Sequence, residues 1–135
     1  MNRRLLSMSI CVFLFALMAI PAFAAAVNNF GFYLTFTGTD RTAAVSKADG
    51  EQKAYITAKT MGVVSKYDRA YFRVRTSAGA KATANCSYTY ANLGVTKTVS
   101  YSILKGVKGN LYRLYGESGD ESTHNGFCVD GRWNP

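Results

Sequence analysis

Short runs of Tyr, Phe, Val, Ile and Thr, separated by turns that contain glycine, dominate the chain after residue 25. Apolar and polar positions alternate most clearly where Phe72 and Val74 are interleaved with Arg73 and Arg75, a pattern typical of half-buried strands. On this basis we expect strands at residues 30–37, 53–60, 71–76, 83–90, 96–104, 111–116 and 127–133. About seven short strands without a clear crossover helix predict an all-β fold, a small antiparallel β-sandwich.

Two of these segments need interpretation. Within residues 51–61, Ala54, Ala58 and Met61 have helical spacing, but the intervening Tyr-Ile-Thr sequence favours a strand, which we expect. In the strand expected at residues 96–104, alternation places Val99, Tyr101 and Ile103 on one apolar face. The last expected strand contains Trp133, which we expect to be buried and to anchor that strand in the core.

The first 24 residues have the three parts of a secretory signal peptide. Arg3 and Arg4 form the basic start, residues 10–20 form the apolar stretch, and Ala22-Phe23-Ala24 is a small-x-small cleavage site. A membrane anchor is less favoured, because a spanning helix needs about 20 predominantly apolar residues. We therefore expect a secreted protein with one β domain at residues 25–135 and no transmembrane segment in the mature chain.

Cysteine usage is consistent with export. Cys11 lies in the leader, so the mature chain keeps two cysteines, Cys86 and Cys128. In an oxidising compartment an even pair usually bonds, and we expect a structural disulfide between these two residues. The alternative is two free buried thiols. A metal site is a weaker interpretation, since the chain has one histidine and no Cys-x-x-Cys spacing.

Residue types that carry catalysis are scarce. The single histidine, His124, lies in a loop without a Gly-x-Ser-x-Gly or comparable motif, so we expect a solvated loop residue. The nearby Glu117, Asp120, Glu121 and Asn125 offer oxygen ligands for calcium, but their spacing does not match the Asp-x-Asp-x-Asp-Gly pattern of a calcium-binding loop. We expect a protein that is not an enzyme and that uses no cofactor or metal, with calcium binding by this loop left open.

Positive charge is the clearest functional signal. The formal net charge is +8, and residues 53–113 contain eleven basic residues against one acid, Asp68. Such a field concentrates anionic partners, and outside a bacterial cell an anionic cell-wall polymer or membrane surface is expected before nucleic acid. The alternative is that scattered cations serve solubility and protect sheet edges. The candidate anion-binding residues are Arg73, Arg75, Lys105, Lys108 and Arg113.

Tyrosines offer a second kind of surface. All nine follow the leader, and Tyr112 and Tyr115 are expected on opposite faces of one strand, whereas Tyr88 and Tyr90 are expected on one face together with Cys86. Exposed tyrosines stack on sugar rings, but tyrosines more often fill a small β core with their hydroxyls at its rim. We expect the core role.

The whole pattern resembles a family of small secreted proteins of Gram-positive bacteria that carry a domain of unknown function. The resemblance rests on the leader ending Ala22-Phe23-Ala24, on Ala-Tyr-Ile-Thr at residues 54–57, and on Val-Asp-Gly-Arg-Trp-Asn-Pro at residues 129–135. More distantly, the chain resembles the lactococcin-972-like bacteriocins, which are small, secreted, basic and rich in β-strands. Neither resemblance supplies catalytic or binding residues for this chain.

These observations together predict a function in binding. We expect a secreted, non-catalytic protein that acts at the anionic bacterial cell envelope through its basic strands. The alternative, which the distant resemblance implies, is a bacteriocin-like antimicrobial protein that acts on competing bacteria.

Overall fold

The computed structural model describes residues 27–36, 38–62, 65–119 and 126–135. The predicted signal peptide at residues 1–24 and the loop positions Asp120, Glu121 and His124 lie outside the described residues. The described part is all-β, as the sequence predicts, with nine strands and one short 3-10 turn, η1 (Tyr90–Asn92). In that part of the chain, no helix is long and apolar enough to cross a bilayer.

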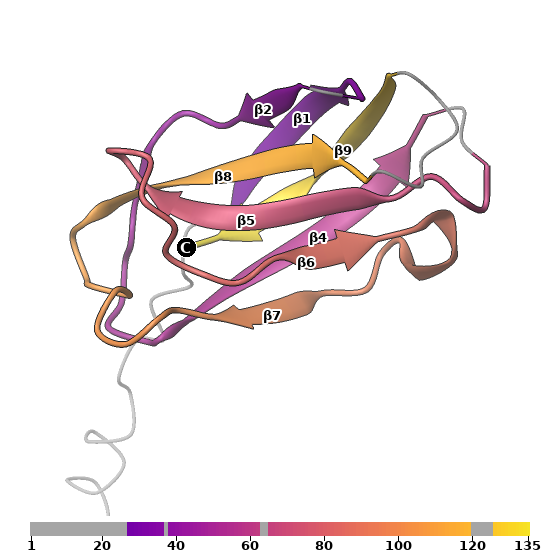
Figure 1. Cartoon of the computed structure of the whole chain (residues 1–135). Coiled ribbons are helices and arrows are strands. Elements are labelled where there is room, and N and C mark those ends of the chain that lie inside the picture. Colours follow the sequence, from indigo (N-terminus) through magenta and orange to yellow (C-terminus); the bar gives the residue numbers. More distant parts are fainter. Residues whose placement is uncertain (1–26, 37, 63–64, 120–125) are drawn as a thin grey trace, which may run out of the picture.

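The strands of the described residues form two antiparallel sheets. The first sheet has the strand order β1 (Asn28–Leu34), β9 (Phe127–Asn134), β4 (Lys53–Met61) and β7 (Lys97–Ser100). The second has the order β2 (Thr39–Arg41), β8 (Leu111–Ser118), β5 (Ala70–Thr76) and β6 (Cys86–Tyr88), and β3 (Val45–Ser46) also pairs with β8. Figure 1 shows β5 and β8 of the second sheet passing across the strands of the first.

Both sheets direct alternate side chains into one hydrophobic core. On β5, Phe72 and Val74 are fully buried, as the alternation predicts. Phe30 of the first sheet packs against Phe72 of the second with ring centroids 5.3 Å apart. The hydroxyl of Tyr88 on β6 donates a hydrogen bond to the carbonyl of Ile56 on β4 at 2.5 Å. These contacts hold the two sheets against each other, and the buried rings supply much of the hydrophobic stabilisation.

The segment with mixed signals is a strand. β4 is an interior strand of the first sheet, between β9 and β7, with Ala54, Ile56 and Ala58 buried. The prediction that Trp133 is buried is also confirmed, because its side chain is 1% exposed on the interior strand β9. At Gly131 the two strands approach so closely that a Cβ atom would collide with the carbonyl of Thr57, and glycine is the residue that permits such contact.

The observed strands differ most from the prediction in three places, while the other strand ends shift by at most three residues. The strand expected at residues 96–104 ends at Ser100, so Ile103 is exposed in a turn and not in the core. The strand expected at residues 83–90 is reduced to Cys86–Tyr88, and Tyr90 lies exposed in η1. The structure adds the short strands β2 and β3, which pair with β8. Strands of two or three residues are too short for alternation to reveal.

The predicted disulfide between Cys86 and Cys128 is absent, and both thiols are free. Cys86 lies opposite Phe72 on the second sheet and is directed toward the core. Cys128 lies between the buried Phe127 and Val129 on the first sheet, so its side chain is on the outer, exposed face. A disulfide needs Cβ atoms within about 4.5 Å, which this placement on separate sheets does not provide.

Candidate functional site

The outer face of the second sheet carries a group of cationic side chains around one tyrosine. On β5, Arg73 and Arg75 alternate with buried residues and are therefore directed away from the core. Arg113 and Tyr115 occupy the equivalent outward positions on β8. Arg41 on the edge strand β2 completes the group. We call these four arginines and Tyr115 the arginine face.

Strand register sets the arrangement of this face. Tyr115 lies opposite Arg73 on one side and opposite Arg41 on the other. The guanidinium of Arg75 lies over the Tyr115 ring, 4.9 Å from its centroid, and that of Arg41 lies 6.0 Å away. Arg41 also donates a hydrogen bond from Nη1 to the Tyr115 hydroxyl at 3.2 Å, a contact that raises the pKa of Arg41. Cation–π contacts of this kind orient the guanidinium groups without neutralising them.

Positive charges oppose one another directly on this face. Arg75 and Arg113 are register partners, and like charges at opposed positions destabilise an antiparallel pair. Arg75 donates to the Gly79 carbonyl at 3.2 Å and Arg113 to the Thr42 carbonyl at 3.1 Å. The dipoles of these two carbonyl groups offset part of the repulsion between the Arg75 and Arg113 guanidinium groups.

Among the described residues, the four arginines have no acidic partner. None of them forms an ion pair with a described residue, and the Arg73 side chain makes no hydrogen bond with one. Glu117 is also directed outward on β8, but its register partners are Tyr71 and Thr39, and it forms no ion pair with these arginines. The four guanidinium groups therefore have no acidic partner among the described residues, and a group of like charges of this kind attracts anions.

The structure brings together three of the five predicted anion-binding residues: Arg73, Arg75 and Arg113. Lys105 lies at the margin of the face, where its Nζ donates to the carbonyl of Lys81 at 2.9 Å and the backbone of Lys81 forms a β-bridge with Arg75.

Lys108 is not part of this group. It lies close enough to Asp49 for its charge to lower the pKa of that carboxyl. The sequence analysis does not identify Arg41, which precedes the dense basic segment, and it predicts a core role for the tyrosines, whereas Tyr115 lies on the outer face. The period-two pattern of β8 was the signal that placed Tyr115 on the same face as Arg113.

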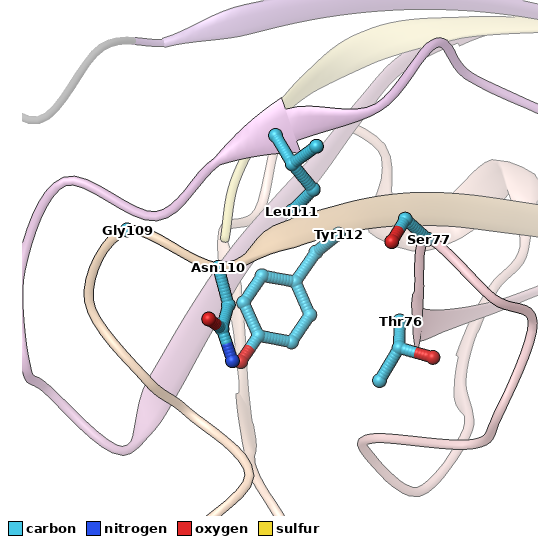
Figure 2. A pocket seen from close by; sticks show the side chains of 6 residues that line it. All are labelled: Thr76, Ser77, Gly109, Asn110, Leu111 and Tyr112. Atoms are coloured by element: carbon cyan, nitrogen blue, oxygen red, sulfur yellow. The ribbon is translucent and has the colours of Figure 1, made fainter.

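A hollow of about 420 Å³ lies where β5 ends and β8 begins. Figure 2 shows its lining: the hydroxyls of Thr76 and Ser77, the Asn110 amide, and the edge of the Tyr112 ring. The Tyr112 hydroxyl is already engaged, since it accepts a hydrogen bond from the Val107 N–H at 2.9 Å. Among the described residues, no carboxylate, imidazole or thiol lines the hollow.

Comparisons with known proteins leave the function to be argued from the structure. Among the described residues, no three His, Cys, Asp or Glu side chains are grouped closely enough to hold a metal ion. No protein-family model matches the chain, and no curated protein matches it in sequence. The arginine face is therefore the strongest candidate for a functional site.

Proposed function

We propose that this protein is a secreted, non-catalytic protein that binds an anionic polymer of the bacterial cell envelope through the arginine face. The observation that carries the proposal is the grouping of Arg41, Arg73, Arg75 and Arg113 on one outer sheet surface without an acidic partner among the described residues. The two sheets are taken as the layers of a small β-sandwich, which directs this surface away from the core.

The chemistry of the face favours phosphate groups. A guanidinium presents a planar fork of donors that matches phosphate oxygens, whereas a lysine ammonium acts as a point charge. Stacking on Tyr115 restricts Arg41 and Arg75 before any ligand arrives, which lowers the entropy cost of ordering them on binding. A phosphate-rich wall polymer, such as teichoic acid, supplies many such groups along one chain and would contact several arginines at once.

The test is co-sedimentation of the chain beginning at Ala25 with purified Gram-positive cell walls that carry or lack teichoic acid. The expected result is binding that requires teichoic acid and that weakens steeply between low salt and about 0.15 M salt, because screening shortens the range of exposed charges. Binding that is equal for the two wall types, or that is insensitive to salt, would contradict the proposal.

Two variants that each lose three positive charges test whether binding depends on the arginine face. R73Q/R75Q/R113Q removes three charges from it, and K53Q/K59Q/K66Q removes three exposed charges elsewhere. The first variant is expected to lose at least about tenfold in affinity, since each charge-assisted hydrogen bond contributes about 1.5–3 kcal/mol. The second should retain most binding. R73K/R75K/R113K keeps the positive charges but loses the planar guanidinium groups. Its affinity therefore shows how much of the binding depends on guanidinium geometry and not on charge alone.

One observation favours the alternative, an antimicrobial protein that acts on competing bacteria. Ile103 and Leu104 stand exposed in the loop that also contains Lys105 and Lys108, and apolar tips with nearby lysines are suited to bacterial membranes. Growth inhibition of related Gram-positive strains by the purified protein would support this function. Full growth of all strains, together with teichoic acid binding, would exclude it.

A further inference from the structure

Two consecutive aliphatic side chains are almost fully exposed in the turn at residues 102–105, which follows β7. Ile103 is 91% exposed and Leu104 is 81% exposed. The strand ends at Ser100, Tyr101 is the last inward residue, and the Lys105 N–H closes the turn on the Ser102 carbonyl at 2.9 Å. Large aliphatic residues usually lie in the core of a small domain, so this pair is available for contact with something outside the protein.

The backbone of the turn is unfavourable for the residue that occupies it. Leu104 has φ 59° and is the one non-glycine residue with positive φ among the described residues. Other turns place glycine at such positions, as at Gly79 and Gly109. A branched side chain in this left-handed region is strained, and strain of this kind persists where the surrounding structure enforces it. The turn has an apolar side chain at this position, although glycine would adopt the same backbone conformation without strain.

The turn is held on a well-ordered base. The Ser102 N–H donates to the Ala82 carbonyl at 2.8 Å, and the Tyr101 ring packs edge-on against Tyr112 with centroids 5.2 Å apart. The Gln52 side chain brackets Gly106, donating to its carbonyl at 2.6 Å and accepting from its N–H at 3.0 Å. The two aliphatic side chains are therefore presented by a fixed support, and little ordering is needed when they bind.

Two lysines follow Ile103 and Leu104 in the same loop, and a third, Lys81, is in contact with the first of them. Lys105 follows Leu104 directly and reaches the carbonyl of Lys81, and Lys108 lies three residues further along the same loop. None of these three lysines forms an ion pair with a described residue. Asp49, whose carboxyl pKa the Lys108 charge lowers, is paired with Lys47 at 2.9 Å. Figure 1 shows this loop at the same end of the molecule as the turn between β5 and β6.

We propose that the turn at residues 102–105 docks the protein on an anionic lipid bilayer. Ile103 and Leu104 enter the boundary between headgroups and acyl chains, while Lys81, Lys105 and Lys108 contact phosphate groups at the surface. A convex tip of two side chains is far too small for a stable protein interface, which buries about 1,000 Å² or more. A bilayer requires only shallow insertion together with electrostatic attraction, and both are present here.

The experiment is sedimentation with vesicles of phosphatidylcholine alone or mixed with phosphatidylglycerol, using the chain beginning at Ala25, which contains every strand of both sheets. The protein is expected to bind the anionic vesicles and not the neutral ones. I103S/L104S should weaken this binding at least about tenfold, as expected for removing two inserted aliphatic side chains. V27S/V95S, which changes two other exposed valines of 59% and 53% exposure, should leave it unchanged. Equal binding by I103S/L104S and the unsubstituted protein would overturn the proposal.

Leu104→Gly separates docking from folding. Glycine relieves the strained φ, so the melting temperature should stay the same or rise, while binding to anionic vesicles falls. A fall in melting temperature with binding unchanged would overturn the role of Leu104. Insertion is followed directly in Leu104→Trp, because the native Trp133 is buried and supplies a constant background. A blue shift of the new fluorescence on anionic vesicles is expected, and an unchanged spectrum would overturn insertion.

The same variants distinguish this proposal from polymer binding by the arginine face. I103S/L104S should bind walls that carry teichoic acid as tightly as the unsubstituted protein does. If vesicle binding depends on Arg73, Arg75 and Arg113 but not on Ile103 and Leu104, docking by the turn is wrong. The arginine face is then the site that binds anions. Capture of the turn by a purified envelope protein without any vesicle binding would also overturn lipid docking.

Discussion

The inner faces of the two sheets are alike, whereas their outer faces differ. Each inner face presents aromatic and aliphatic side chains to the shared core. On the outer face of the second sheet, four arginines surround Tyr115 without an acidic partner among the described residues. On the outer face of the first sheet, the single arginine of β9, Arg132, lies opposite the neutral residues Asn29 and Thr57.

An acidic residue completes the contrast. Asp130 shares the outer face of β9 with Arg132 and accepts a hydrogen bond from the Thr60 hydroxyl at 3.1 Å. On β9 of the first sheet an acid and a base therefore share the outer face, whereas the four arginines of the second sheet have no acidic partner among the described residues. Folding constrains the inward half of each strand, because those positions bury apolar surface. The outward half is free to differ, so the difference between the outer faces is where binding properties are expected.

The largest effect should come from the core that both sheets share. Trp133→Ala removes a side chain that is 1% exposed and is expected to cost about 3–5 kcal/mol of unfolding free energy. The adjacent Arg132→Ala, on the outer face of the same strand, should change it by less than about 0.5 kcal/mol. Urea unfolding of both variants measures this, and similar effects at the two positions would contradict the assignment of faces.

Each sheet has one cysteine, so thiol labelling can compare an inward position on the second sheet with an outward position on the first. Burial raises the pKa of Cys86 to about 11, and this residue is directed into the core. Cys128 is exposed on the outer face of the first sheet. The raised pKa lowers the thiolate fraction of Cys86 about 100-fold at pH 8, and burial shields its sulfur, so Cys86 should react with iodoacetamide far more slowly than the exposed Cys128. Mass spectrometry gives both rates, and urea should equalise them. A Cys86–Cys128 disulfide peptide would overturn the placement of these cysteines.

A buried lysine joins the sheets. Lys47, which follows β3 of the second sheet, is 1% exposed, donates to the Lys53 carbonyl of β4 at 3.2 Å and pairs with Asp49 at 2.9 Å. Lys47→Met keeps the apolar stem but loses these contacts, and is expected to cost about 2 kcal/mol in chemical denaturation. A variant as stable as the unsubstituted protein would show that this contact does not join the sheets energetically.

The dependence of stability on pH should also test the Lys47–Asp49 ion pair. Burial raises the pKa of Asp49, but hydrogen bonds from Lys47 and the Glu51 N–H, together with nearby lysine charges, outweigh burial and leave this pKa below its ordinary value. Because the folded state lowers the pKa, the pair stabilises above the unfolded pKa and its contribution is lost as pH falls through the folded one. Stability curves against pH should therefore fall less steeply in acid for Lys47→Met.

The smallest effect concerns the arginine face itself. Tyr115→Phe removes the hydroxyl that accepts from Arg41 but keeps the ring under Arg75. Stability should change by less than about 0.5 kcal/mol, because the pair is exposed, and wall binding by about twofold. Tyr115→Ala also removes the ring and is expected to weaken wall binding further. Equal affinities for the Phe and Ala variants would show that stacking does not position the arginines.

The local alternation of apolar and polar residues predicted several of the strands and their buried positions. Alternation in residues 72–75 correctly assigned the buried and outward side chains of β5, and the opposite placement of Tyr112 and Tyr115 was likewise confirmed. The strand at β4 and the burial of Trp133 were also confirmed. Export, the envelope as partner and the resemblance to small secreted Gram-positive proteins remain predictions. Alternation failed at Ile103, because a turn closed by local backbone hydrogen bonds interrupts the period.

The sequence by itself determined that the chain is all-β, which positions face inward on its longer strands, and that its charge is strongly positive. Side-chain direction within a strand is a local property with a period of two residues. Only the tertiary structure decided which strands are neighbours. That choice placed Arg113 opposite Arg75, brought Arg41 to Tyr115, and separated Cys86 from Cys128. Pairing between strands distant in sequence depends on how two sheets bury a common core, and no local pattern in one chain specifies it.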